Sequence, residues 1–134
     1  MGNIIYEAFF VDLSTLEKVY PGVLFRQIKF PHVTTAYRPK KTSKSLYGRT
    51  VTIKVTGYAN DGENEGVKVT VITDDPELKK MIENIPVPHI TISVAEKGKP
   101  VNTGKLNFEP IESTDEIVFK GTFGGFTGEG VNLG

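Results

Sequence analysis

The sequence predicts an α+β fold that is rich in antiparallel strands and contains only a few helices. Its 134 residues have the size of one domain with a real core. A hydrophobic content of 38% with 24% charged residues is typical of a globular protein. Several segments alternate between apolar and polar residues, which is the two-residue period of a half-buried strand, and other segments carry helix start and stop signals.

The N-terminal part is predicted to contain two extended segments with a short helix between them. Residues 4–11 are dense in β-branched and aromatic side chains, which favour a strand. Asp12 or Ser14 could cap a helix over residues 16–20, which the following Pro-Gly pair would end. Residues 23–30 alternate only partly, and we interpret them as an extended run.

The middle of the chain carries the strongest hairpin signal. Residues 50–58 and 67–72 alternate cleanly, and Asp-Gly and Asn-Glu-Gly between them supply turn sequences. A helix is predicted over residues 76–84, because Asp and Pro precede and open it. Its apolar face would consist of Leu78, Met81 and Ile82.

The C-terminal part is more polar and richer in turns. Residues 96–105 are expected to form a loop, followed by a short edge strand near residues 106–108 and a later strand over residues 116–123. We therefore assign residues 1–126 to a single domain. Residues 127–134 are glycine-rich and are expected to form a flexible tail.

The chain has two histidines, and each lies in the same short motif of proline, histidine, a β-branched apolar residue and threonine, at residues 31–34 and 88–91. Side chains alternate between the two faces of a strand, so the histidine and threonine of each motif would share one face. Val33 and Ile90 would point the opposite way, into a core. Two such strands side by side would bring two imidazoles and two hydroxyls to one surface.

These four side chains, His32, Thr34, His89 and Thr91, are the candidate catalytic residues. An acid, a base and two hydrogen-bond donors suffice to cleave a phosphodiester. A lone histidine on a strand is more often a structural residue. The repetition of the whole motif favours the catalytic interpretation.

The doubled motif resembles that of the 2H (two-histidine) phosphoesterase superfamily, which has His-apolar-Thr/Ser-apolar once in each half of a small domain. Residues 89–92 match this signature in full, whereas Thr35 stands where the first copy would have an apolar residue. The 57 positions from His32 to His89 suit a compact member, similar to RNA 2′,3′-cyclic phosphodiesterase-like proteins. The resemblance covers nearly the whole chain, although its specific part is the two motifs.

The resemblance implies two lobes related by a pseudo-twofold axis, with the motif strands facing a central cleft. It also implies a phosphodiesterase that needs no metal or other cofactor. One neutral histidine would remove a proton from the nucleophile, and the other, protonated, would protonate the leaving oxygen. The substrate would be a 2′,3′-cyclic phosphate RNA end if water attacks, or a small linear or cyclic oligonucleotide if a ribose 2′-hydroxyl attacks.

Substrate-binding candidates follow the first motif. Residues 38–54 contain six basic residues and no acidic one, although the chain has 16 residues of each sign. Such a segment could attract a phosphate-bearing substrate, or it could be an ordinary solvated loop. Phe123 could stack on a base or pack in the core. The candidates are Tyr37, Arg38, Lys40, Lys41, Lys44 and Phe123.

Three other functions stay open. Within the same superfamily, the chain could be a viral enzyme that destroys nucleotide second messengers. It could instead be a non-catalytic nucleotide- or RNA-binding module, which would not need two proton-transfer groups. It could also be a metal enzyme in which His32, His89 and a carboxylate such as Glu7 are the ligands.

Composition also bears on the cellular context. The chain has no cysteine, which excludes disulfides and thiolate metal sites and fits a reducing compartment. No apolar run approaches the roughly 18 residues of a membrane-spanning helix, and the first residues lack the basic start of a secretory leader. We therefore expect a cytoplasmic monomer that does not bind membranes.

Overall fold

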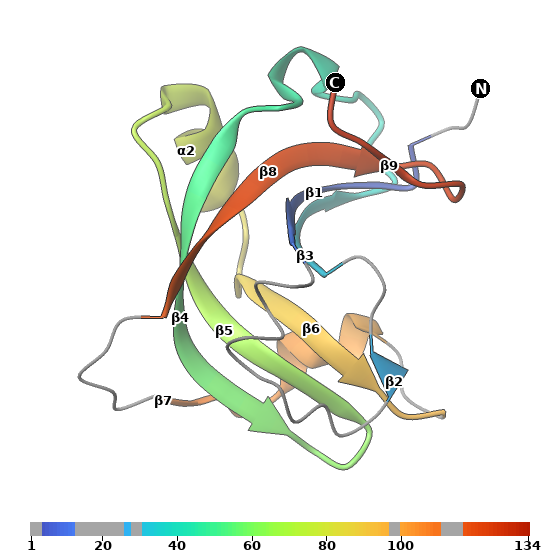
Figure 1. The fold of residues 1–134 in the computed structure, drawn as a ribbon, viewed down its shortest axis with the longest axis vertical. Helices are drawn as coiled ribbons and strands as arrows, with labels where there is room; N and C mark the ends of the chain where they lie inside the picture. Colours follow the sequence, from blue (N-terminus) through green and yellow to red (C-terminus); the bar gives the residue numbers. More distant parts are fainter. Residues whose placement is uncertain (1–3, 13–25, 28–30, 97–99, 111–116) are drawn as a thin grey trace.

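Antiparallel strands form one strongly curved, nearly closed sheet that resembles a barrel in the computed structural model (Figure 1). This confirms the prediction of a fold dominated by antiparallel strands, and the described part of the chain contains one α-helix. The structure describes residues 4–12, 26–27, 31–96, 100–110 and 117–134. None of the helices in these ranges has the length and apolar character that a membrane-spanning helix requires.

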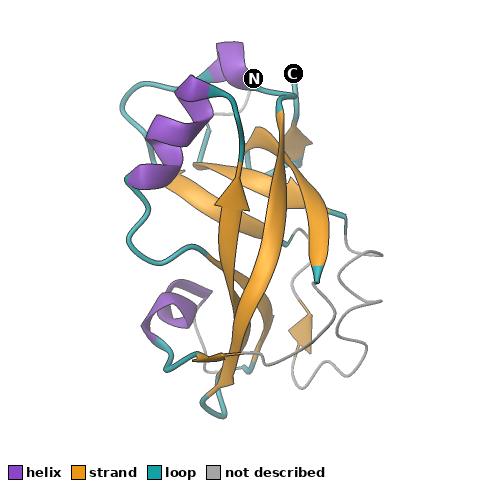
Figure 2. Ribbon diagram, turned by 90° about the vertical axis from the view of Figure 1, so that its left-hand side faces the viewer, coloured by secondary structure: helices purple, strands orange, loops and turns teal. Residues whose placement is uncertain are grey.

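The elements follow one another along the chain with short connections where both neighbours are described. The strands are β1 (Tyr6–Val11), β2 (Arg26–Gln27), β3 (His32–Tyr37), β4 (Thr50–Asn60), β5 (Asn64–Ile72), β6 (His89–Val94), β7 (Glu109–Pro110), β8 (Val118–Phe126) and β9 (Val131–Asn132). The helices are the α-helix α2 (Pro76–Glu83) and the 3₁₀ helices η1 (Lys44–Leu46) and η2 (Pro100–Lys105). Figure 2 shows that α2 and η2 lie toward opposite ends of the sheet.

The strand order explains how the sheet curls back on itself. It runs β2-β6-β5-β4-β8-β1-β3, with β7 paired to β4 and β9 paired to β8. Some Cα atoms of β3 come within 8 Å of Cα atoms of β6, although these strands lie near opposite ends of the order. The curvature therefore brings the two strands that carry the histidine motifs toward each other.

One hydrophobic core fills the inside of the curved sheet. It receives apolar side chains from β1, β3, β4, β5, β6 and β8, and α2 adds Leu78. The fully buried aromatic and aliphatic members include Phe9, Ile53, Val67, Leu78, Ile90 and Phe123. On β5, where Val67, Val69 and Val71 enter the core, the alternating Lys68 and Thr70 are exposed on the opposite face.

The predicted hairpin and the predicted helix are both confirmed. Strands β4 and β5 pair antiparallel, and the Asp61 carboxylate accepts hydrogen bonds from the Glu63 and Asn64 backbone amides at 2.9 and 2.8 Å. These hydrogen bonds lower the pKa of Asp61, and the bond from the Asn64 amide has the largest effect. Gly62 has a φ of +88°, which glycine adopts without strain.

Two C-terminal expectations differ from the structure. The tail contains β9, which pairs with Gly125 and Phe126 of β8, because two extended residues after the turn at 127–130 can return along that strand. The edge strand expected at 106–108 is absent from the described residues there; η2 precedes that segment and β7 follows it. The helix expected at 16–20 lies outside the described residues, and of residues 23–30 the structure describes β2, which pairs with β6.

We predict that Asp75→Ala destabilises the protein by about 1 kcal/mol, because Asp75 is the N-cap of α2. Its carboxylate accepts from the Glu77 and Leu78 amides at 3.0 and 3.4 Å, and these amides have no partner within the helix. Urea denaturation would measure the loss. Asp74→Ala, at the exposed neighbouring position, is the control, and equal losses in both variants would contradict a capping role.

Candidate functional site

The two histidine motifs occupy equivalent places at the starts of two strands. Strand β3 begins at His32, and strand β6 begins at His89. Val33 and Ile90 are buried in the core, with 1% and 0% of their surfaces exposed, as the alternation predicts. Each histidine therefore lies on the opposite face of its strand, together with Thr34 or Thr91.

Each motif strand also pairs with one neighbour in the same register. We call β1 with β3 the first motif unit, and β5 with β6 the second motif unit. In both units the partner strand runs antiparallel and places three consecutive residues opposite histidine, apolar residue and threonine. The pairs are Phe10–His32, Phe9–Val33 and Ala8–Thr34 in the first unit, and Lys68–His89, Val67–Ile90 and Gly66–Thr91 in the second.

The equivalence extends to both ends of the paired region. The carbonyl of the proline before each histidine accepts a backbone hydrogen bond from a valine of the partner strand, at 3.0 Å in each unit. Beyond the threonine, both motif strands have a bulge at the third residue after histidine, Thr35 or Ile92. A bulge adds one residue to one strand and re-aims the side chains that follow.

A buried glutamate marks the same position of each unit. Glu7 and Glu65 are each 2% exposed and each accept a tyrosine hydroxyl, from Tyr47 at 2.8 Å and from Tyr58 at 2.5 Å. A second donor completes each site: the Ser43 amide on Glu7 at 2.8 Å and the Ser93 hydroxyl on Glu65 at 2.7 Å. Burial raises the pKa of the Tyr47 hydroxyl, and its hydrogen bond to the Glu7 carboxylate raises this pKa further.

Our sequence analysis did not find this pair of glutamates. The signal is present, because Glu-Ala-Phe-Phe-Val at 7–11 aligns with Glu-Gly-Val-Lys-Val at 65–69. The glutamates precede the histidines by 25 and 24 positions. Aligning the segment before His32 with the segment before His89 would have revealed the repeat.

His32 lies among aromatic rings of β1. Its ring centroid is 4.5 Å from that of Tyr6 and 5.6 Å from that of Phe10. Its Nδ1 atom is 3.4 Å from the Tyr6 hydroxyl. Burial raises the pKa of Tyr6 to about 12, so the phenol keeps its proton at neutral pH and can donate to Nδ1.

His89 has a different partner. Its Nδ1 atom is 2.7 Å from the backbone oxygen of Val87, and a carbonyl oxygen can only accept. Nδ1 therefore carries a hydrogen, and Nε2 of the neutral ring keeps its lone pair. Gly104 of η2 lies against this ring, because a Cβ atom at Gly104 would be 3.0 Å from His89 Cε1.

The basic loop after β3 is exposed and follows the strand that begins with the first histidine. Lys40, Lys41 and Lys44 are exposed, and the Arg38 guanidinium carbon is 5.4 Å from the ring centroid of Tyr37, which is itself 68% exposed. The loop begins at the end of β3 opposite to His32.

Two earlier suggestions do not fit the structure. Phe123 is fully buried and packs on Phe9 and Tyr47, with ring centroids 5.5 and 5.4 Å apart, so it is a core residue and cannot stack on a base. The Glu7 carboxylate binds Ser43 and Tyr47, and no group of three histidine, cysteine or acidic residues within the described part of the chain could hold a metal ion.

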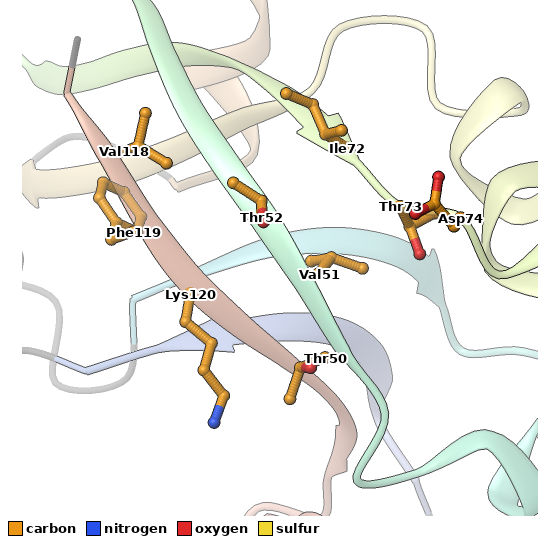
Figure 3. A pocket seen from close by; sticks show the side chains of 9 residues that line it. All are labelled: Thr50, Val51, Thr52, Ile72, Thr73, Asp74, Val118, Phe119 and Lys120. Carbon is orange, nitrogen blue, oxygen red and sulfur yellow. The ribbon is translucent and has the colours of Figure 1, made fainter.

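A surface hollow of about 460 Å³ lies elsewhere, on strands β4, β5 and β8 (Figure 3). Neither histidine lines it. Figure 3 shows its lining as a mixture of polar and apolar side chains, namely Thr50, Val51, Thr52, Ile72, Thr73, Asp74, Val118, Phe119 and Lys120.

Comparison of the sequence with models of protein families and with curated proteins gave no match.

We predict that Glu65→Ala destabilises the protein by about 2–3 kcal/mol, because it leaves the Tyr58 and Ser93 hydroxyls without their acceptor. Thermal and urea unfolding would measure the loss. Glu63→Ala in the neighbouring exposed turn is the matched control, with an expected effect within about 0.5 kcal/mol. Equal stability of the Glu65 variant and the wild type would contradict this role of the carboxylate.

Proposed function

We propose that the chain is a metal-independent phosphodiesterase that uses two His-x-Thr motifs, as in the 2H phosphoesterase superfamily. The observation that carries the proposal is the repeat of the two motif units, which share register, bulge position and a buried glutamate. Structural histidines have no reason to recur in such detail. We further propose that each unit is the centre of one lobe, related to the other by a pseudo-twofold axis.

The hydrogen bonds of the two rings suggest different roles for the histidines. His89 donates from Nδ1 to Val87, so its Nε2 atom can accept a proton and act as the base. In protonated His32 both nitrogens carry a hydrogen, and the Tyr6 hydroxyl can accept from Nδ1, which leaves the Nε2 hydrogen to be donated as the acid. In the proposed reaction, His89 removes the proton of the nucleophile, and His32 protonates the leaving oxygen.

The threonines supply the remaining chemistry. Thr34 and Thr91 share the faces of their histidines and would donate hydrogen bonds to the non-bridging phosphate oxygens, where negative charge builds up. With water as nucleophile, its oxygen bonds to phosphorus and one P–O bond of a 2′,3′-cyclic phosphate breaks. With a ribose 2′-hydroxyl as nucleophile, the same groups would cleave a small linear or cyclic oligonucleotide.

We predict that His32→Ala and His89→Ala each lower kcat by about 10²–10⁴-fold and leave the fold intact, because each removes one proton-transfer group. The wild type should give a bell-shaped pH–rate profile. His89→Ala should lose the fall in rate at low pH, and His32→Ala should lose the fall at high pH. Circular dichroism would check the fold, and most of the activity remaining in either variant would refute the two-histidine mechanism.

A panel of substrates makes this experiment decisive. It should contain 2′,3′-cyclic mononucleotides, RNA with a cyclic-phosphate end, 2′,5′ and 3′,5′ oligoadenylates, and cyclic di- and trinucleotides, each with and without EDTA. Turnover of only the cyclic oligonucleotides would favour an enzyme that degrades second messengers, and turnover of only the cyclic ends would favour RNA processing. Loss of activity in EDTA would favour a metal enzyme. Binding without turnover would favour a non-catalytic module.

We also predict that replacing Lys40, Lys41 and Lys44 by glutamine raises KM and weakens its dependence on salt, while kcat stays the same. These lysines are exposed, and exposed charges act mainly by long-range attraction, which salt screens beyond about 10 Å at 0.1 M. Steady-state kinetics at several salt concentrations would measure this. Replacing Lys79 and Lys80 of α2 is the control, and unchanged KM at low salt in the loop variant would identify an ordinary solvated loop.

A further inference from the structure

We propose that Thr103 and Asn64 are positioning residues for Thr91, and that η2 holds the second motif in its reactive arrangement. This inference deepens the proposed phosphodiesterase function and rests on it. It assigns a role to a segment that sequence analysis treated as a loop.

Three polar side chains form a buried chain of hydrogen bonds beside the second motif. The Asn64 amide nitrogen donates to the Thr103 hydroxyl at 2.9 Å, and the Thr91 hydroxyl donates to the same oxygen at 2.9 Å. Asn64 and Thr103 are 0% exposed, and Thr91 is 8% exposed. Such burial fixes the Thr91 side chain more firmly than hydrogen bonds to water would.

The chain can also supply the hydrogen that Thr91 needs. The Asn64 amide nitrogen can only donate, whereas each hydroxyl can rotate to donate or accept. When a phosphate oxygen approaches Thr91, rotation of both hydroxyls reverses the bond between them, so that Thr91 accepts from Thr103 and donates to the phosphate. Hydrogen bonds in such a chain strengthen one another, which favours charge on the phosphate oxygens.

Two glycines let η2 come close enough. A Cβ atom at Gly66, opposite Thr91, would be 2.3 Å from Thr103 Cγ2, so any larger residue there would displace Thr103. Gly104 lies on the His89 ring in the same way. The first unit has Ala8 at the position of Gly66. The two units therefore differ where η2 covers the second motif.

The test compares Thr103→Val, which keeps the shape but removes the hydroxyl, with Thr103→Ser, which keeps the hydroxyl. Two readouts are needed: kcat and KM on a substrate that the wild type turns over, and the affinity for inorganic phosphate from the NMR shift of the His89 Cε1 proton. Thr103→Val should lower kcat by about 10- to 100-fold with little change in KM, because small displacements of a reacting group cost that much. It should also bind phosphate more weakly, and Thr103→Ser should restore most of both.

Two further variants separate positioning from folding. Asn64→Asp replaces the donor by an acceptor, draws the Thr103 hydrogen away from Thr91 and should reproduce the Thr103→Val defect. Thr127→Val removes a threonine hydroxyl that binds the Gly130 carbonyl in the C-terminal turn, and it should behave as wild type. Thermal unfolding of every variant would show whether the fold is kept.

The outcomes separate this inference from the proposed function. Wild-type kcat and phosphate affinity in a folded Thr103→Val variant would overturn the positioning role, as would equal defects in Thr103→Val and Thr103→Ser. If the wild type turned over no substrate, the proposed function would fail, while the phosphate affinities of the variants would still decide the role of Thr103. If the wild type bound no phosphate either, both would be overturned.

Discussion

The register of two strand pairs is the constraint on which the rest of the structure depends. A shift of one residue would turn every side chain of a motif strand to the other face, so that Val33 or Ile90 would leave the core and a histidine would enter it. The same pairing, from the proline carbonyl to the bulge, occurs in both motif units. The apolar core therefore fixes the polar face, and the candidate chemistry follows from the burial of its neighbours.

A buried glutamate lies beside the bulge of each motif unit. A carboxylate out of contact with water is costly unless it is well hydrogen-bonded, and Glu7 and Glu65 each have two donors. Glu65 accepts from Ser93 of its own motif strand β6 and from Tyr58 of β4. Glu7 accepts from Ser43 and Tyr47, which follow β3 in the basic segment. The Glu65 contacts thus tie β6 to β5 just beyond the bulge, and the Glu7 contacts hold the basic segment next to β1.

The sequence was sufficient for features set by local pattern. Alternation predicted the β4–β5 hairpin and the inward direction of Val33 and Ile90, and Asp-Pro predicted α2. Features that depend on distant partners were missed. A glutamate in a turn-rich stretch is typical of the surface, and the burial of Glu65 depends on Tyr58 and Ser93, which come from other strands. Thr103 lies in a polar stretch, and its close approach to β5 and β6 depends on the missing side chain of Gly66. Phe123 could be assigned to the core only once its position opposite Phe9 was known.

The differences between the two units are as informative as their likeness. In the first, an aromatic side chain, Tyr6, approaches Nδ1 of His32 and the threonine lies opposite alanine. In the second, a backbone carbonyl binds Nδ1 of His89, and η2 covers the threonine. A carbonyl can only accept, so it fixes a hydrogen on Nδ1 of His89, whereas a phenol hydroxyl can donate to Nδ1 of His32 or accept from it. Two motifs of similar sequence thus have different hydrogen-bond partners: the position of the hydrogen is fixed on the neutral His89 ring, and the Tyr6 hydroxyl can follow the protonation of His32.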